Sequence, residues 1–433
     1  MKNLRTLFIA VNCAMCISAA AVEPTTEIYR MAGNYFSYPY TNAPAPKLTA
    51  APKGYEPFHI EHYGRHGSRW LLGQNDYNRA IELLLPAERN GKLTERGKEL
   101  MAQLRSIAAK AVKRDGELTK VGADQHRGIA KRMYANFPQV FSKGARIDAR
   151  STVVVRCILS MDNELQELKA ANPSLEITSD ASASTMDYMN HSYTEGRRMG
   201  MRANQELGRY HQGHPSKYTY IDKIVSDKQF AKDSINTSYL FSQLAALTNH
   251  NQAHYDMPNL YDLFTKEELE GQWINDNAWW FFNYSNSAIT ENIMPYSQQT
   301  LLRNIIASAD TALVAGRNSA NLRFGHDTVL LPLAALMELG DSGKEHNSVE
   351  ELTASGWRVD NIIPMAGNLQ MIFYRPKKAK QSSDDILVKI LLNEQEMTLP
   401  VASDKAPYYR WSDLRKYYLD KLDNFNASHE KKQ

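Results

Sequence analysis

The stretch Phe58–Tyr63, with the sequence FHIEHY, leads through Gly64 into Arg65-His66-Gly67-Ser68-Arg69. The first stretch is short and rich in apolar and aromatic residues, which predicts a β-strand. The two arginines that follow supply rigid, bidentate donors suited to phosphate oxygens, and the histidine between them is a nucleophile able to accept a phosphoryl group. A basic loop that caps neighbouring carboxylates is the alternative interpretation. The segment therefore predicts a strand that ends in a phosphate site or in such a loop.

Outward from this segment, helical and strand patterns alternate along the chain. Apolar residues recur at helical spacing after Leu93, and Leu118-Thr119 and Asn172-Pro173 are a helix start and a helix stop. The alternation favours an α/β fold with a mostly parallel central sheet and helices on both faces. The predicted helices are 94–114, 120–136, 157–171 and 329–339, and the predicted strands are 58–63, 145–155, 321–325, 368–375 and 386–392.

Between about 180 and 305 the strand signals vanish and Tyr, Asn, Gln and Met become frequent. Thr265 and Glu268 form a capping box that opens a helix. We interpret the stretch as a helical insertion, whose aromatic block Trp279–Phe282 is expected to form its core, with a substrate platform as the alternative. The predicted organisation is an α/β domain of 22–179 and 306–433, with a helical insertion or cap domain of 180–305.

The N-terminal segment 1–21 has the pattern of a secretory signal. Lys2 and Arg5 precede an apolar run, and Ala19-Ala20-Ala21 provides a small-residue cleavage site. The apolar run is too short to span a bilayer comfortably, which argues against a membrane anchor. Cleavage would leave Cys157 as the single cysteine, which suits a bacterial periplasm better than a eukaryotic secreted enzyme. We therefore expect a periplasmic or secreted protein that has no membrane contact after cleavage.

The overall charge is close to balanced. The chain has 51 basic and 48 acidic residues, a formal charge of +3, and Lys2 and Arg5 account for two of those positive charges. This balance argues against a nucleic-acid partner and against a long-range field that attracts polyanions. Any affinity for phosphate must therefore be built locally, and small-molecule phosphomonoesters are the expected partners. The sequence predicts no oligomeric state.

Two later segments add to the opening motif. Arg156 follows the apolar run Val153–Val155, which we expect to be a strand end, where an α/β sheet places ligand contacts. His326-Asp327 lies at another predicted strand-to-helix turn. Each has a structural alternative: Arg156 as a surface residue at a helix start, and Asp327 as a helix N-cap. Three strand ends with such residues are harder to explain by structure alone.

These segments together resemble the signature motifs of the histidine acid phosphatases. Arg65-His66-Gly67-Ser68-Arg69 and Gly325-His326-Asp327 are similar to the two signatures of that family. The intervening segments Leu118-Thr119-x-x-Gly122-x-x-Gln125 and Arg150-Ser151-Thr152-x-x-x-Arg156-x-x-x-Ser160 follow in the right order. The resemblance covers roughly 55–165 and 300–395, and the stretch 180–300 lies where the family carries a variable helical domain.

The resemblance implies a role for each site residue. His66 would attack phosphorus and become phosphohistidine, and Asp327 would protonate the leaving alcohol oxygen. The phosphoryl oxygens would be held by Arg65, Arg69, Arg156 and His326. An arginine cluster can supply the charge stabilisation that phosphoryl transfer needs. The sequence shows no cluster with metal-ligand spacing, so neither a metal nor another cofactor is expected.

The substrate class follows less directly. The frame Leu322–His326 resembles the inositol-polyphosphate phosphatase branch, which usually has His-Ala-Glu where this chain has His326-Asp327-Thr328. Asp327 instead matches the pattern of bacterial phytases and glucose-phosphatases, and Trp70-Leu71 follow Arg69 where family members often have a proline. We expect an exported, metal-independent phosphomonoesterase acting on inositol polyphosphates such as phytate. A broad-specificity acid phosphatase or sugar-phosphatase is the enzymatic alternative, and a non-catalytic phosphate-ester binding protein is the alternative of another class.

Overall fold

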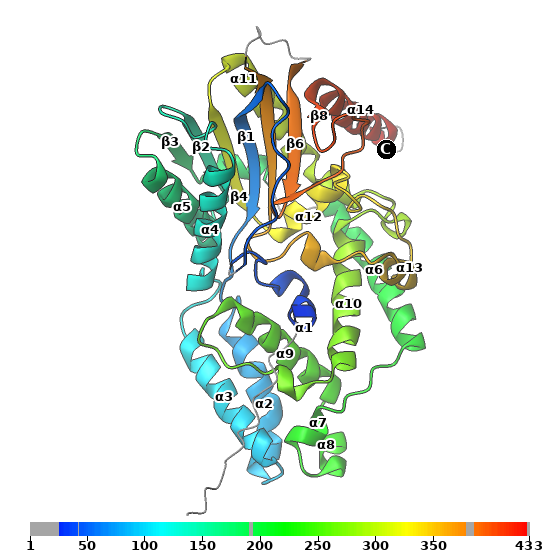
Figure 1. The fold of residues 1–433 in the computed structure, drawn as a ribbon. Helices are drawn as coiled ribbons and strands as arrows, with labels where there is room; N and C mark the ends of the chain where they lie inside the picture. Colours follow the sequence, from blue (N-terminus) through cyan, green and yellow to red (C-terminus); the bar gives the residue numbers. More distant parts are fainter. Residues whose placement is uncertain (1–25, 42, 190–193, 378–384, 431–433) are drawn as a thin grey trace, which may run out of the picture.

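A mixed β-sheet organises the computed structural model, which describes residues 26–41, 43–189, 194–377 and 385–430 (Figure 1). Within those residues the strand order is β3-β2-β4-β1-β5-β6-β7, and β8 pairs with β6. The strands are β1 Tyr55–Arg65, β2 Arg146–Ser151, β3 Glu176–Asp180, β4 Ser319–Gly325, β5 Asn368–Pro376, β6 Leu387–Leu392, β7 Gln395–Glu396 and β8 Tyr409–Arg410.

The strands β3, β2, β4 and β1 run parallel to one another, whereas β5 to β8 join the sheet in antiparallel pairs. In the parallel part Arg65 lies beside Gly325 and Ser151 lies beside Phe324. The carboxyl ends of β1, β2 and β4 therefore meet at one edge of the sheet. The predicted α/β class with a sheet that is parallel in its core is confirmed.

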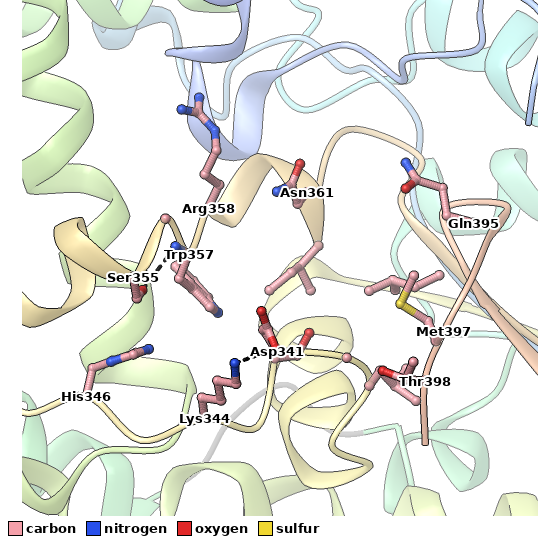
Figure 2. A pocket seen from close by; sticks show the side chains of 16 residues that line it. Asp341, Lys344, His346, Ser355, Trp357, Arg358, Asn361, Gln395, Met397 and Thr398 are labelled. Atoms are coloured by element: carbon pink, nitrogen blue, oxygen red, sulfur yellow. Dashed lines mark hydrogen bonds and ion pairs between the residues drawn. The ribbon is translucent and has the colours of Figure 1, made fainter. Parts of the chain in front are cut away.

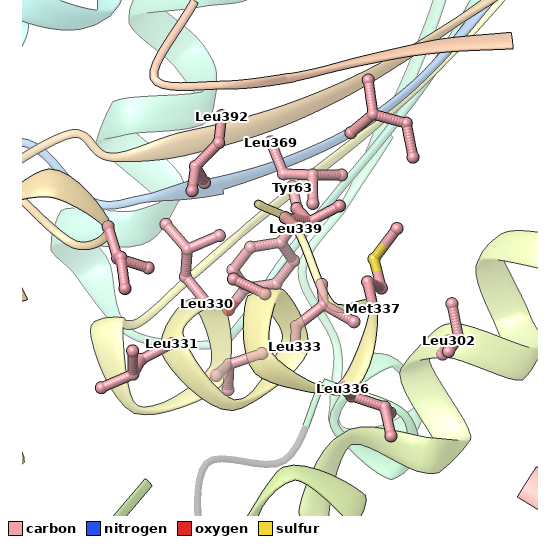
Figure 3. Close-up of a cluster of buried hydrophobic side chains, with 14 of the residues drawn as sticks. Tyr63, Leu302, Leu330, Leu331, Leu333, Leu336, Met337, Leu339, Leu369 and Leu392 are labelled. Atoms are coloured by element: carbon pink, nitrogen blue, oxygen red, sulfur yellow. The ribbon is translucent and has the colours of Figure 1, made fainter. Parts of the chain in front are cut away.

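Side chains of successive strand residues alternate between two apolar layers. On β1, Tyr63 packs on one face and Ile60 on the other, and Phe58, at the irregularity between Pro57 and His59, packs on the face of Tyr63. The first face is covered by helices α11 Gln299–Ala315, α12 Asp327–Leu336 and α14 Trp411–Glu430, and the second by α4 Lys120–Asn136 and α5 Val155–Ala171. Figure 3 shows α12 packed against Tyr63, Leu369 and Leu392 from the strands. The central strands of the sheet are thus buried on both faces.

A second body of helices lies beyond the carboxyl ends of the parallel strands (Figure 1). Its apolar cluster joins α2 and α3 to helices of the later stretch 220–273. The helices outside the sheet layers are α2 Gln74–Arg89, α3 Glu95–Ala111, α6 Thr194–Gly213, α7 Ile221–Ile224, α8 Lys228–Ser234, α9 Thr237–His250, α10 Lys266–Tyr284 and α13 Val349–Ser355. The predicted domain boundaries at 179/180 and 305/306 stay a prediction. Helices from both sides of the first boundary contribute to this apolar cluster, and α11 runs across the second boundary.

One predicted strand segment is wrong. β2 ends at Ser151, and the run Val153–Val155 leads into α5, which begins at Val155. Val153 and Val155 are 51% and 64% exposed, so their β-branched side chains are not part of the sheet. The helix α2 and the edge strand β3 were not predicted. The predicted signal 1–21 lies outside the described residues, and no helix within them is long and apolar enough to cross a membrane.

Candidate active site

The three loops that follow β1, β2 and β4 meet at the carboxyl edge of the sheet. His66 N–H donates to the Gly325 carbonyl at 2.9 Å, and Thr152 N–H donates to the Phe324 carbonyl at 3.0 Å. These bonds extend the strand pairing past the last strand residues, so the loops leave the sheet side by side. The parallel topology therefore brings together the arginine–histidine motif, the segment before Arg156, and His326-Asp327.

The motif loop rests on the first turn of α4, where two glycines let the backbones touch. A Cβ atom at Gly67 would lie 2.5 Å from the Gly122 carbonyl oxygen, and one at Gly122 would collide with the Ser68 carbonyl. Thr119 caps α4 and donates its hydroxyl to the Ser68 carbonyl at 3.0 Å. Gln125 accepts from Ser68 N–H at 2.9 Å. The segment 118–125 therefore packs against the motif loop and holds its backbone by hydrogen bonds.

His66 is buried, 2% exposed, with its imidazole oriented by the loop itself. Its Nδ1 lies 2.9 Å from the Gly67 carbonyl oxygen. A carbonyl only accepts hydrogen bonds, so Nδ1 carries the proton and the lone pair lies on Nε2. Burial, followed by the charges of Arg65, Arg156 and Arg69, holds the pKa of His66 well below its usual value. The imidazole is therefore neutral, as a nucleophile must be.

Arg65 lies under the loop as the last residue of β1 and has a fully buried side chain. Its Nη1 donates to the carbonyls of Asn34 and Ile363, each at 2.6 Å. Its Nη2 pairs with Asp327 Oδ2 at 2.6 Å. Two carbonyls and a carboxylate hold the guanidinium in one orientation.

Asp327 is the first residue of α12, and His326 occupies the N-cap position before it. The carboxylate is therefore not an N-cap; its Oδ2 faces Arg65 and accepts from Asn34 Nδ2 at 3.2 Å. Burial favours the protonated form, but Arg65, His326 and Asn34 outweigh it and lower the pKa of Asp327. This carboxyl is therefore an anion paired with Arg65.

Arg156 lies in the first turn of α5, past the strand end where it was predicted. It reaches the site because the β2–α5 connection is short, and its neighbour one turn on, Ser160, accepts from Gly67 N–H at 3.1 Å. Among the described residues, the buried Nε atoms of Arg65, Arg69 and Arg156 have no hydrogen-bond partner. Buried donors of this kind call for an acceptor, and an oxyanion supplies acceptor oxygens.

His326 completes the group. Its ring lies edge-on to that of His66, with the ring centroids 5.8 Å apart. Its N–H donates to Tyr63 Oη at 2.9 Å, and Cys157 Sγ lies 3.8 Å from its Nε2. All six residues expected in the site, His66, Asp327, Arg65, Arg69, Arg156 and His326, are brought together by the fold.

Three residues that the sequence did not indicate also border the site. Asn34 contacts both Arg65 and Asp327. Tyr35 lies beside it in the short helix Gly33–Tyr35, and Arg69 stacks over its ring at 5.8 Å. His250, at the end of α9, donates from Nε2 to the Arg69 carbonyl at 2.7 Å. The helix α1 Thr26–Arg30 and the short helix Gly33–Tyr35 after it bring Asn34 and Tyr35 to the site.

A separate cavity of about 430 Å³ lies away from these residues. Figure 2 shows it between the segment around Asp341 and Lys344, the segment 355–362 and the β6–β7 hairpin with Gln395 and Met397. The Lys344 ammonium is paired with Asp341 at 2.8 Å, so the two charges on its floor cancel. This cavity has no cluster of cations comparable with the one around His66.

Comparison with known proteins agrees with the geometry. Residues 65–393 match the model of the histidine phosphatase superfamily, branch 2. The chain belongs to this family, and it is a phosphomonoesterase. It is similar to multiple inositol polyphosphate phosphatase 1 of Gallus gallus, 23% identical over 89% of this chain and 86% of that protein, and to the Homo sapiens protein of the same name, 24% identical over 73% and 68%.

Solved structures share the fold. The multiple inositol polyphosphate phosphatase of Bifidobacterium longum in complex with inositol hexasulfate has a TM-score of 0.70 and 20% identity, over 89% of this chain and 97% of that one. The phytase from D. castellii has a TM-score of 0.65 and 14% identity, over 95% and 90%. The predicted family, histidine acid phosphatase of the phytase and inositol-polyphosphate phosphatase type, is thereby confirmed.

Proposed function

We propose that this phosphomonoesterase works through a phosphohistidine on His66 and acts on inositol polyphosphates. The observation that carries the mechanism is the state of His66: a neutral imidazole with its lone pair on Nε2, among guanidinium donors that lack partners in the described part of the chain. A site that only bound phosphate would gain nothing from a nucleophile kept neutral at its centre.

In the first step, the lone pair on His66 Nε2 forms a bond to phosphorus while the bond from phosphorus to the ester oxygen breaks. Asp327 delivers a proton to that oxygen, and the alcohol leaves. In the second step, a water oxygen attacks phosphorus and returns its proton to Asp327, and the N–P bond breaks to release phosphate and neutral His66. The Gly67 carbonyl supports the positive charge that the imidazole carries in between.

Asp327 must hold a proton at the start of the reaction, yet the neighbouring Arg65 lowers the pKa of its carboxyl. A bound phosphate dianion would compete for the Arg65 guanidinium and place negative charge beside the carboxyl. Both effects raise the pKa of a carboxyl group. Substrate binding is therefore the event that we expect to load the proton.

The substrate class is supported by the relatives. Two are named multiple inositol polyphosphate phosphatases, and one solved neighbour holds inositol hexasulfate. We propose the same class of ester here, with export from the cytoplasm by segment 1–21 and catalysis without a metal ion. Export would give a periplasmic or secreted enzyme, and a generalist acid phosphatase or sugar-phosphatase is the second candidate.

Trapping the intermediate tests the mechanism. We expect ³²P from a labelled monoester to remain on the protein after a brief acid-free denaturing quench, and to be absent from His66→Ala. His214→Ala is the matched control, because His214 is an exposed histidine in the helical body. Turnover of His66→Ala above about one per cent of wild type would overturn the assignment, since covalent catalysis rarely survives loss of its nucleophile. Turnover by the wild type without label would point to direct attack by water.

A substrate panel tests the class. Phytate, glucose phosphates and nucleotides would be compared by kcat/KM with and without EDTA. Preference for phytate by at least about tenfold, or 1.4 kcal/mol, and indifference to EDTA support the proposal. Equal values across the panel would favour the generalist, and loss with EDTA that a divalent ion restores would contradict the metal-free mechanism.

A further inference from the structure

His250 belongs to the helical body, yet it contacts the catalytic loop directly. It ends α9, is 1% exposed, and donates from Nε2 to the Arg69 carbonyl at 2.7 Å. Arg69 and His250 are 181 positions apart in the chain. This hydrogen bond joins the backbone of the arginine–histidine motif to the helices beyond the strand ends.

The surroundings of His250 leave its ring one orientation. The ring meets Tyr35 edge-on at 6.1 Å and Tyr77 at 5.9 Å, measured between ring centroids. Tyr77 Oη accepts from Leu71 N–H at 2.7 Å. The Arg69 carbonyl and the Leu71 amide are thus both held by side chains from helices, two residues apart on the same loop.

Trp70, the residue between Arg69 and Leu71, is also held by side chains. Trp70 lies between His254, with ring centroids 4.2 Å apart, and Arg114, whose guanidinium carbon lies 4.9 Å from the Trp70 ring. Trp70 N–H donates to the Glu117 carbonyl at 2.8 Å. Side-chain contacts therefore fix the chain at Trp70-Leu71, where family members often have a proline.

The chemical state of His250 suits a permanent donor. Burial, followed by the neighbouring His254, lowers the pKa of His250 to about 3. The neutral ring has a single N–H, and the Arg69 carbonyl fixes it on Nε2. The bond therefore persists through mildly acidic conditions.

We propose that His250 is a positioning residue for phosphate: through its Nε2–H bond to the Arg69 carbonyl it fixes the backbone from which the Arg69 guanidinium reaches the phosphoryl oxygens. The inference rests on the proposed role of Arg69 as a phosphate ligand. The Arg69 guanidinium also stacks on Tyr35, which touches His250. Backbone and head group are thus both set by contacts with His250 and its neighbour.

Two conservative variants separate the hydrogen bond from packing. The amide nitrogen of His250→Gln lies at the reach of Nε2 and can donate to Arg69, whereas that of His250→Asn lies at the reach of Nδ1 and falls short. Inorganic phosphate affinity would be measured by calorimetry, without turnover. We expect His250→Asn to bind phosphate roughly tenfold more weakly, as loss of a buried hydrogen bond predicts, and His250→Gln to stay within about threefold of wild type. KM should rise more than kcat falls.

Arg69→Ala separates this inference from the proposed function. If Arg69→Ala weakens phosphate binding and His250→Asn does not, the positioning role is overturned while the phosphate site stands. If Arg69→Ala binds as wild type, the proposed role of Arg69 fails. Equal weakening in His250→Gln and His250→Asn would show that the ring packs rather than donates, which also overturns the inference.

A measurement on the unmodified protein covers the case in which a variant fails to fold. Nitrogen NMR of ¹⁵N-histidine-labelled enzyme should show His250 as the neutral Nε2–H tautomer at pH 5, with a shift on addition of phosphate. A charged ring or the Nδ1–H tautomer at that pH would contradict the proposal.

Discussion

The sheet side and the helical side of the site hold the same loop, Arg65–Arg69, in different ways. On the sheet side, Arg65 ends β1, Arg156 and Asp327 lie shortly after β2 and β4, and all three present their own charged groups. On the helical side, Asn34 and His250 meet the site largely through backbone: Arg65 donates to the Asn34 carbonyl, and His250 donates to the Arg69 carbonyl. Groups that meet the reacting phosphate are thus separated in the fold from groups that orient them.

This difference predicts different outcomes of mutation. Loss of a sheet-side group removes charge or a proton from the reaction, which changes kcat by orders of magnitude. Loss of a helical-side group leaves the charged side chain in place but removes one buried hydrogen bond that orients it, so the expected effect is smaller. The following predictions test that contrast, beginning with the largest effect.

Asp327→Asn should show the largest effect of these. The variant keeps the shape of the side chain but cannot deliver a proton, so alkyl phosphates should lose about 10²- to 10⁴-fold in kcat. Aryl phosphates with acidic phenols leave without protonation and should lose far less. Initial rates on both ester types across pH measure this. Equal losses on both ester types would show that Asp327 is not the general acid and acts only by orienting Arg65.

Arg156→Ala should lose roughly 10- to 100-fold in kcat/KM, because a charged donor to phosphate is worth about 1.5–3 kcal/mol. Arg156→Lys should lie between, since a point charge replaces a planar fork. Arg146→Ala is the matched control, from the exposed opposite end of β2. A lysine variant that equals wild type would show that Arg156 is not a bidentate ligand.

The buried histidines should make folding stability depend on pH. Burial is the main cause that lowers the pKa of His62 and of His254 to about 4. The folded protein keeps both rings neutral, while the unfolded chain takes up protons below about pH 6.5. Stability is therefore complete above pH 6.5 and falls as the pH drops toward 4, by about 1.4 kcal/mol per pH unit for each ring.

Urea unfolding at several pH values measures this slope. His254→Gln should flatten it by the contribution of one ring, and the exposed His214→Gln should leave it unchanged. A profile for His254→Gln that parallels wild type would mean that His254 is protonated in the folded state.

Asn34→Ala should give the smallest effect. Its amide favours the ionised form of Asp327, so its removal should raise the pKa of that carboxyl. The high-pH limb of kcat, where the general acid loses its proton, should move upward by the same amount. Asn34→Asp should move it further in the same direction, because a like charge is added. If the high-pH limb does not move in either variant, the Asn34 side chain does not control the protonation of Asp327.

Much of the sheet side was predictable because strand ends are local in sequence and convergent in space. The motif loop, Arg156 and His326-Asp327 each come after a strand that the sequence indicates. Parallel pairing of those strands then places the three segments at the same edge of the sheet. The error at Val153–Val155 has a physical cause: β-branched residues favour strands by propensity, but pairing with β4 ends at Ser151, so those valines have no partner strand.

The helical side was not predictable for an equally physical reason. A hydrogen bond to a carbonyl uses an atom that every residue has, so the Arg69–His250 contact leaves no pattern at Arg69. Asn34 lies in a proline-rich stretch that lacks helical periodicity, and its helix is three residues long. Such contacts come from tertiary packing alone.

The burial of α12 implies that enzymatic activity is lost on heating only when the whole protein unfolds. Its residues 329–331 and 333–336 are at most 2% exposed, and Pro332 is buried. Its first residue is Asp327, and Figure 3 shows its leucines packed in the core. The amide protons of such a helix exchange with solvent only when the core opens. Heating should therefore leave each molecule either fully active or globally unfolded, so that residual activity after a heat pulse reports the surviving fraction of native protein.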